Sequence, residues 1–192
     1  HGVSGMILHP RFYDLPQVDR AARRRELGLD PETPTAVVLF GGFGSKQMLG
    51  ILKRLDESGL NMQAILIAGR NDRLRERLEA MPARMKKHVV GFTNEVPSYM
   101  LTADFFIGKP GPGSLSEAIH LGLPAITVSN AWTLPQERYN ARWLTENGLG
   151  MVLDSFDGID AAVSRMLAGT TLAEMRERTS ARGPSLVCTG MA

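Results

Sequence analysis

The sequence holds a single cysteine, Cys188, so no disulfide can form within the chain. It also lacks any apolar run close to the roughly 18 residues that a helix needs to cross a bilayer. Neither charge sign is in large excess, because the 22 lysine and arginine residues outnumber the 20 aspartate and glutamate residues by only two. This balance gives no indication of nucleic-acid binding. A lone thiol is typical of a reducing compartment, and we expect a cytoplasmic protein with at most peripheral attachment to the inner face of a membrane.

Several ligand-binding motifs are missing as well. The phosphate-binding pattern G-x-x-x-x-G-K-[ST] does not occur, and Gly42-Phe43-Gly44 lacks the third glycine of the dinucleotide fingerprint. No acidic residue ends the second predicted strand, where an adenosine ribose would bind, so nicotinamide and flavin cofactors are disfavoured. There is no Asp-x-Asp pair, and His, Cys and the carboxylates show no convincing metal-ligand spacing. We therefore expect neither a cofactor nor a metal.

Six short apolar runs predict buried strands at residues 35–40, 63–68, 87–92, 105–107, 125–128 and 149–153. Helical patterns alternate with these runs. The alternation predicts an α/β fold with a Rossmann-like, doubly wound parallel sheet of six strands. We expect the domain at residues 18–180, with an interdomain linker at 1–17 and a tail at 181–192. Because the chain begins at His1 and not at a methionine, we expect a piece of a longer protein.

Four glycine-rich or polar loops follow these strands, at residues 41–45, 92–96, 108–114 and 129–137. Right-handed crossovers place such loops at the carboxyl ends of parallel strands, where ligands bind. In the third loop we expect Ser114 to cap a helix, with Glu117 three residues later completing a capping box. Glycines before a helix N-terminus predict an anion site, and two such loops favour a phosphate or diphosphate.

The polar side chains near this edge suit a sugar. The Glu117 carboxylate offers two oxygens to a vicinal diol such as ribose, or else it caps backbone N–H groups. Gln136, Glu137 and Asn140 combine the donors and acceptors that sugar hydroxyls require, the alternative being helix capping on an exposed surface. These residues therefore favour a ligand that carries both phosphate and sugar.

Basic side chains are the remaining candidates for phosphate contacts. Lys109 and Lys46 lie in the two glycine loops and would neutralise phosphate charge, or else they are exposed loop charges. The arginines of the first predicted helix are expected to form a solvated face, the alternative being a patch for anionic lipid headgroups. They are Arg20, Arg23, Arg24 and Arg25.

The most specific motifs are PGPGSLSEA at residues 110–118 and PQERYN at residues 135–140. They match P-G-P-G-[ST]-x-x-E-A and Q-[EQ]-x-x-N, patterns of the carboxyl-terminal donor-binding domain of GT-B glycosyltransferases. The chain resembles the family, similar to glycosyltransferase family 28, of monogalactosyldiacylglycerol synthases, diacylglycerol glucosyltransferases and the GlcNAc transferase that makes lipid II. GGFGSK at residues 41–46 and GFTNEV at residues 91–96 match further loops, and the resemblance covers roughly residues 34–155.

The resemblance implies one half of a GT-B fold and a role for each site residue. Phe92 and Thr93 would flank uracil, and Glu117 would hold the ribose. The donor sugar would lie against Gln136, Glu137 and Asn140. The diphosphate would lie between two groups, with Gly111, Pro112, Gly113 and Ser114 on one side and Gly42, Phe43, Gly44 and Ser45 on the other.

The implied activity is metal-independent transfer of a hexose from a UDP-sugar to a diacylglycerol-type lipid. Glu137 stands where the lipid II enzyme has a second glutamine, which favours galactose or glucose over GlcNAc. The acceptor site and the catalytic base would belong to a missing amino-terminal domain, so we assign no catalytic residue and expect the isolated domain to be inactive. The alternatives are a lipid II-type GlcNAc transferase, a UDP-GlcNAc epimerase and a GT-B-like binding module without transfer activity.

Overall fold

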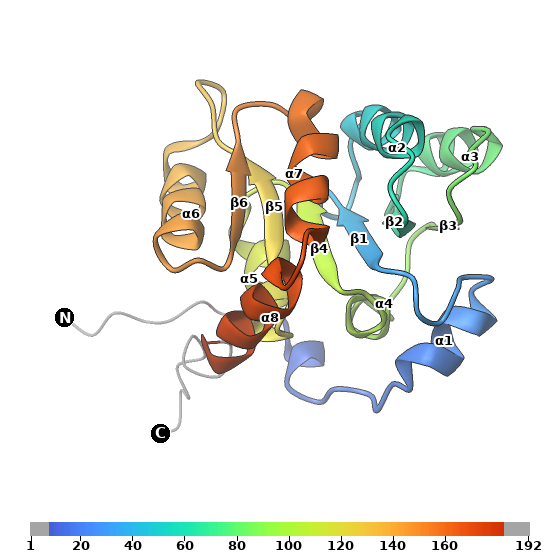
Figure 1. Ribbon diagram of the computed structural model, residues 1–192, viewed down its shortest axis with the longest axis horizontal. Coiled ribbons are helices and arrows are strands. Elements are labelled where there is room, and N and C mark those ends of the chain that lie inside the picture. Colours follow the sequence, from blue (N-terminus) through green and yellow to red (C-terminus); the bar gives the residue numbers. More distant parts are fainter. Residues whose placement is uncertain (1–7, 183–192) are drawn as a thin grey trace.

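The computed structural model describes residues 8–182, and its centre is a sheet of six parallel strands (Figure 1). The strand order is β3-β2-β1-β4-β5-β6, so the direction of winding reverses between β1 and β4. This doubly wound order confirms the predicted Rossmann-like fold class. The strands are β1 Thr35–Leu39, β2 Gln63–Ile67, β3 Lys87–Val90, β4 Phe105–Gly108, β5 Ala125–Val128 and β6 Gly150–Leu153.

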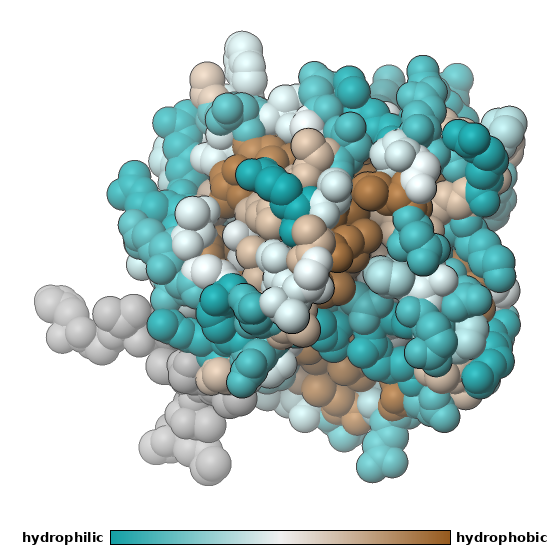
Figure 2. All heavy atoms as spheres, in the orientation of Figure 1, coloured by the Kyte–Doolittle hydropathy of each residue, from teal (hydrophilic) through white to brown (hydrophobic). Residues whose placement is uncertain are grey.

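Helices connect the strands and cover both faces of the sheet (Figure 1). Apolar residues of α2, α3 and α7 pack in one core cluster, and those of α4, α5 and α6 pack in another. Hydrophilic residues cover most of the face seen in Figure 2, with apolar residues showing in patches between them. The helices are η1 Pro10–Phe12, α1 Arg20–Glu26, α2 Gln47–Glu57, α3 Asp72–Ala80, α4 Val96–Thr102, α5 Pro112–His120, α6 Pro135–Glu146, η2 Phe156–Gly158, α7 Ile159–Leu167 and α8 Thr171–Arg182.

The alternation of side chains along β1 shows how the strands divide the core. Ala36 and Val38 belong to the cluster that contains α2, whereas Val37 and Leu39 belong to the cluster that contains α5. Val37 lies in register with a residue of β2 on one side and of β4 on the other. A strand buried on both faces needs an apolar residue at nearly every position, which explains the unbroken run of β1.

The six predicted strands are all present, and β5 has the predicted bounds. The structure differs from the expectation near both chain ends. Leu8 and Phe12 are buried in the α5 cluster, although their segment has the composition of a linker. Helix α8 continues to Arg182, so the first two residues of the predicted tail are helical. The rest of that tail lies outside the described residues, and the domain limits stay predictions.

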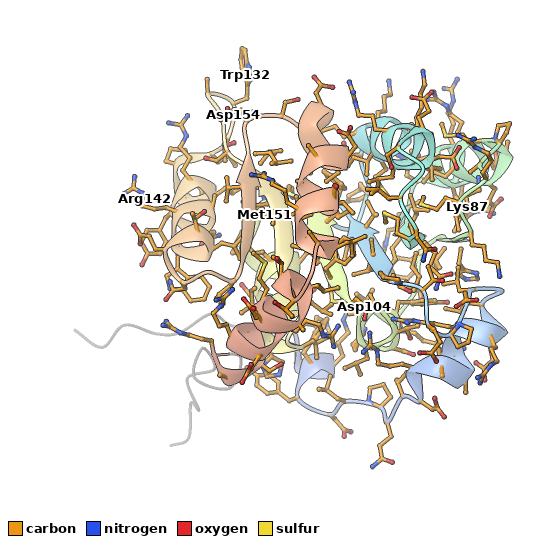
Figure 3. All side chains as sticks on the ribbon, viewed as in Figure 1. Lys87, Asp104, Trp132, Arg142, Met151 and Asp154 are labelled. Carbon is orange, nitrogen blue, oxygen red and sulfur yellow. The ribbon has the colours of Figure 1, made fainter. Side chains whose placement is uncertain are left out.

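Asp104, directly before β4, joins distant parts of the chain (Figure 3). Its Oδ2 accepts hydrogen bonds from Arg24 Nη2 and from the Thr35 N–H, both at 2.7 Å. Its Oδ1 accepts hydrogen bonds from Arg20 and from Arg176, the latter at 3.3 Å. The Arg24 side chain is only 5% exposed, so the expected solvated arginine face is wrong at this position. The guanidinium turns inward because a carboxylate is there to neutralise it.

Replacing Asp104 by asparagine should lower the free energy of unfolding by about 3–5 kcal/mol, because the buried Arg24 loses its counterion. Urea unfolding at neutral pH measures this change. Asp157→Asn is the control, because the Arg54–Asp157 pair is exposed and such pairs contribute at most about 1 kcal/mol. Equal effects of the two substitutions would contradict the role of Asp104.

Candidate functional site

A cavity of about 240 Å³ lies at the carboxyl ends of the strands, where the winding reverses between β1 and β4. Crevices at this position are the usual ligand sites of doubly wound sheets. The cavity brings together residues from three of the four predicted loops. The predicted site residues in its walls are Gly42, Phe92, Thr93, Gly113, Ser114 and Glu117.

Glycines let the loops after β1 and β2 approach each other at the cavity. A Cβ on Gly69 would lie 2.3 Å from the carbonyl oxygen of Gly42, and the Arg70 N–H donates to that oxygen at 2.8 Å. Gly44 has a φ of +60°, and a Cβ there would lie 2.7 Å from the carbonyl oxygen of Ala68. Gly44 therefore packs against protein, whereas Gly42 lines the cavity.

Helix α5 begins two residues before the predicted cap at Ser114, so that prediction is wrong. Gly111 is the N-cap, and Pro112 takes the first helical position. Proline is favoured there because its fixed φ suits a helix and its missing N–H needs no partner. Ser114 consequently lies in the first turn, and Glu117 is not part of a capping box. The Glu117 carboxylate therefore does not cap the backbone N–H groups at the start of α5.

Glu117 is 9% exposed and lines the cavity, and its carboxylate accepts no hydrogen bond from the described residues. Burial raises its pKa, and the nearby Arg11 guanidinium opposes this effect. Buried carboxylates are normally paired or hydrogen-bonded because desolvation of a charge is unfavourable. An unpaired one in a cavity wall indicates a ligand that donates hydrogen bonds.

Arg11 is a cavity residue that the sequence pattern did not reveal, since its segment resembles a linker. Phe12 is fully buried, and its carbonyl oxygen lies 3.2 Å from His120 Nε2, which holds the segment against α5. The Arg11 Nε is buried without a hydrogen-bond partner among the described residues. No periodic pattern in the sequence marks this segment, because its only helix within the described residues is the short 3-10 helix η1, Pro10–Phe12, and Leu8 lies outside it.

Phe92 offers an aromatic surface at the rim of the cavity. Its side chain is 57% exposed, and the guanidinium carbon of Arg70 lies 4.3 Å from the centre of its ring. Thr93 lines the same wall. An exposed ring beside a guanidinium is a suitable stacking surface for a planar group such as a nucleobase.

The predicted sugar-binding residues lie outside the walls of this cavity, on α6. Asn140 is buried, and its Nδ2 donates to the carbonyl oxygen of Pro110 at 3.0 Å. Glu137 Oε1 lies 3.9 Å from Lys109 Nζ, and Gln136 is exposed. The amide of Asn140 thus joins α6 to the loop before α5. The other predicted residues outside the cavity walls are Phe43, Gly44, Ser45, Gly111 and Pro112, and all these ligand roles stay predictions.

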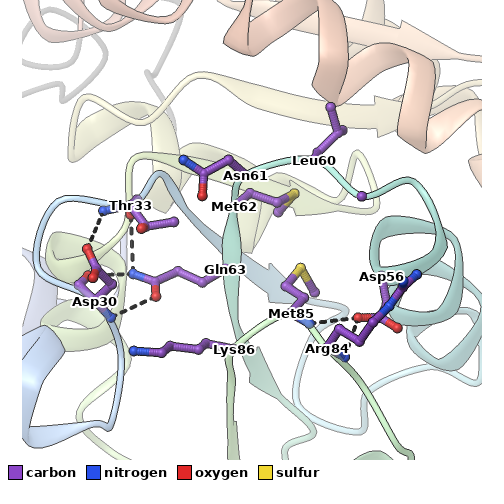
Figure 4. Close-up of a pocket in the computed structure, with 11 residues that line it drawn as sticks. Asp30, Thr33, Asp56, Leu60, Asn61, Met62, Gln63, Arg84, Met85 and Lys86 are labelled. Atoms are coloured by element: carbon purple, nitrogen blue, oxygen red, sulfur yellow. Dashed lines mark hydrogen bonds between the residues drawn. The ribbon is translucent and has the colours of Figure 1, made fainter.

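A larger cavity of about 460 Å³ lies at the opposite edge, beside the start of β2 (Figure 4). In its wall, Gln63 Nε2 donates to the Asp30 carbonyl oxygen at 2.7 Å, and Gln63 Oε1 accepts the Asp30 N–H at 2.8 Å. Asp56 Oδ1 accepts two backbone N–H groups at 2.7 Å. Because these groups are satisfied within the protein, they do not indicate a ligand.

Two further observations concern metals and membranes. Among residues 8–182, no group of three His, Cys, Asp or Glu side chains is arranged to hold a metal ion. Within the same range, every helix is too short or too polar to cross a membrane. The expectations about cofactors and metals stay predictions.

A doubly wound parallel sheet with a glycine-lined cavity at its switch point defines a Rossmann-like domain of the class that commonly binds nucleotides. Residues 36–183 match the family model of the glycosyltransferase family 28 C-terminal domain. The chain therefore belongs to this family of glycosyltransferase domains, as the sequence resemblance implied.

Two plant proteins illustrate the relationship. The chain is 35% identical over 135 residues to a probable monogalactosyldiacylglycerol synthase 3 of Oryza sativa subsp. japonica. It is 30% identical over 155 residues to monogalactosyldiacylglycerol synthase 1 of Arabidopsis thaliana. These alignments cover 67% and 77% of this chain but only 26% and 28% of the relatives. The chain thus spans about a quarter of the length of these enzymes.

Solved glycosyltransferases share the fold. WaaG, a glycosyltransferase involved in lipopolysaccharide biosynthesis, has a TM-score of 0.66 at 19% identity, over 96% of this chain and 52% of WaaG. SsfS6 of Streptomyces sp. SF2575, complexed with thymidine diphosphate, has a TM-score of 0.61 at 15% identity, over 81% of this chain and 38% of SsfS6. The chain corresponds to about half or less of each protein, in agreement with one half of a GT-B fold.

Glu117→Gln should raise the free energy of unfolding at pH 7 by about 1 kcal/mol, because it removes an unpaired buried charge. A raised folded-state pKa means that folding favours the protonated carboxyl. The protonated Glu117 carboxyl contributes fully to stability below pH 4.5, the ordinary pKa of glutamate. This contribution is lost as the pH rises through the folded-state pKa of Glu117. The higher free energy of unfolding of Glu117→Gln, relative to the unmodified protein, should therefore appear near pH 7 and vanish below pH 4.5.

Urea unfolding at several pH values measures this difference. Glu146→Gln is the matched control, because Glu146 is an exposed glutamate on α6. A loss of stability in Glu117→Gln at neutral pH would show that the ionised carboxylate has an internal partner.

Proposed function

We propose that this chain is the donor-binding domain of an enzyme that transfers a hexose from a UDP-sugar to a diacylglycerol-type lipid without a metal ion. The observation that carries the proposal is Glu117, a buried cavity carboxylate that accepts no hydrogen bond from the described residues. A ribose diol presents two hydroxyl donors to the two carboxylate oxygens. The names of the relatives support a galactosyl donor and a diacylglycerol acceptor.

The nucleotide would extend along the strand ends in this proposal. The base stacks on Phe92, the ribose meets Glu117, and the diphosphate lies between Gly42 and Gly113. The first-turn N–H groups of α5 lack partners within the helix, and the helix N-terminus attracts negative charge. The hexose then extends from the diphosphate toward Glu137.

The same arrangement supports transfer without a metal. Negative charge develops on the diphosphate as the bond to the hexose breaks, and the N-terminus of α5 and the Arg11 guanidinium stabilise this charge. The acceptor site and the catalytic base belong to the remainder of the longer protein. Because the acceptor is a lipid, that protein works at a membrane surface, which we place at the cytoplasmic face with peripheral attachment.

Glu117→Ala should weaken binding of UDP, UDP-galactose and UDP-glucose by about 1–3 kcal/mol, or roughly 5- to 150-fold, because the ribose loses a charged acceptor. Calorimetry on the isolated domain measures this change. UDP-GlcNAc belongs in the series to test a GlcNAc donor, and NAD tests a dinucleotide domain. The control is Glu146→Ala on α6. Failure of the unmodified domain and of the full-length protein to bind any uridine nucleotide would leave a module without donor binding.

Affinity for UDP-glucose should fall as the pH is lowered through the raised pKa of Glu117, since a protonated carboxyl accepts hydrogen bonds less well. A UDP-sugar suits this test because its phosphates do not titrate in this range, whereas the terminal phosphate of UDP does. Arg11→Ala should move the midpoint to higher pH, because Arg11 lowers the Glu117 pKa. Glu117→Gln should bind weakly without this pH dependence. A midpoint that persists in Glu117→Gln would assign the titration to another group.

A further inference from the structure

Lys109 follows β4 directly, and its side chain runs between the loops after β1 and β4. A Cβ on Gly111 would lie 3.3 Å from Lys109 Cε, and a Cβ on Gly41 would lie 3.9 Å from the same carbon. Gly41 lines the 240 Å³ cavity, and Gly111 is the N-cap of α5. Gly111 therefore gives room to the lysine, while the distance at Gly41 is an ordinary contact that places the lysine beside the position of the proposed diphosphate.

Glu137 is the counterion of this lysine. Lys109 Nζ lies 3.9 Å from Glu137 Oε1, which is longer than a hydrogen bond, and the two side chains are 52% and 13% exposed. The ammonium group donates no hydrogen bond to the described residues. Its three N–H donors consequently remain available to a ligand while its charge is held near Glu137.

A hydrogen bond keeps the lysine loop and the Glu137 helix in place relative to each other. Asn140 is buried, and its Nδ2 donates to the carbonyl oxygen of Pro110, the residue after Lys109. Glu137 precedes Asn140 by three positions, so both lie on the same side of α6. The Lys109–Glu137 pair is thus held by the fold near the start of α5.

We propose that Lys109 binds the diphosphate of the nucleotide sugar and at the same time orients Glu137 toward the hexose. This inference rests on the proposed function. Without a cation between them, the diphosphate and the Glu137 carboxylate repel each other at short range. Lys109 removes this repulsion, so that a carboxylate can bind sugar hydroxyls next to a diphosphate.

The test compares uridine, UDP and UDP-glucose as calorimetric ligands of the 192-residue chain. Lys109→Ala should lower the affinity for UDP and for UDP-glucose by about tenfold or more, which is the effect of losing a charged hydrogen bond. The affinity for uridine should not change. Uridine also reports that the variant is folded. Lys53→Ala is the matched control, because Lys53 and Glu57 form an exposed ion pair on α2, with Lys53 Nζ 3.8 Å from Glu57 Oε1. It should alter none of the three affinities.

A second substitution separates charge coupling from a structural role. In the Lys109→Ala background, Glu137→Gln should restore UDP affinity by about threefold or more, because it removes the uncompensated repulsion. With Lys109 present, Glu137→Gln should weaken UDP-glucose relative to UDP. If Lys109→Ala lowers the affinities for uridine and UDP equally, the inference is overturned. It is also overturned if the effects of Lys109→Ala and Glu137→Gln on UDP affinity are strictly additive. Neither result would affect nucleotide binding by the unmodified chain. If neither this chain nor the full-length protein binds uridine or UDP, the proposed function itself is overturned.

Discussion

Asp104 receives hydrogen bonds from both ends of the described chain, from Arg20 and Arg24 of α1 and from Arg176 of α8. Because the same carboxylate accepts the Thr35 N–H, it also fixes β1 and β4 to each other where they begin. These are the two strands between which the winding reverses. This charged contact therefore supports the pairing of β1 and β4 at the end of the sheet opposite the crevice.

The carboxylates at the two ends of the parallel strands differ in their hydrogen bonding. Asp104 is surrounded by donors, whereas Glu117 is buried and accepts no hydrogen bond from the described residues. Such an unpaired carboxylate destabilises a fold, and groups of this kind are typical of binding sites. The contrast identifies the site better than cavity size does. The larger cavity beside Gln63 has polar walls whose groups already bond to each other.

The predicted ligand-binding loops of this glycosyltransferase domain form one connected unit in the described chain. Asn140 joins α6 to the loop that leads into α5, and Lys109 and Glu137 form an ion pair across the same contact. The residues expected at the sugar are therefore positioned by the loop expected at the diphosphate. The chain spans about a quarter of the length of its plant relatives, so this unit corresponds to only one part of those proteins.

Much of the fold could be predicted because its signals are local. Strands buried on both faces need unbroken apolar runs, and glycines mark the loops at the edge where ligands bind. The start of α5 was predicted wrongly because Gly111 and Ser114 are both acceptable caps, and Pro112 decides between them. The sequence by itself thus determined the α/β class, the strand positions and the edge of the sheet at which the glycine-lined cavity lies. Only the tertiary structure decided which side chains face the cavity. Arg11 lies in the same cavity wall as Glu117 because the carbonyl oxygen of the next residue, Phe12, contacts the ring of His120, 108 positions along the chain. Burial and contacts between residues so far apart in the sequence leave no local pattern.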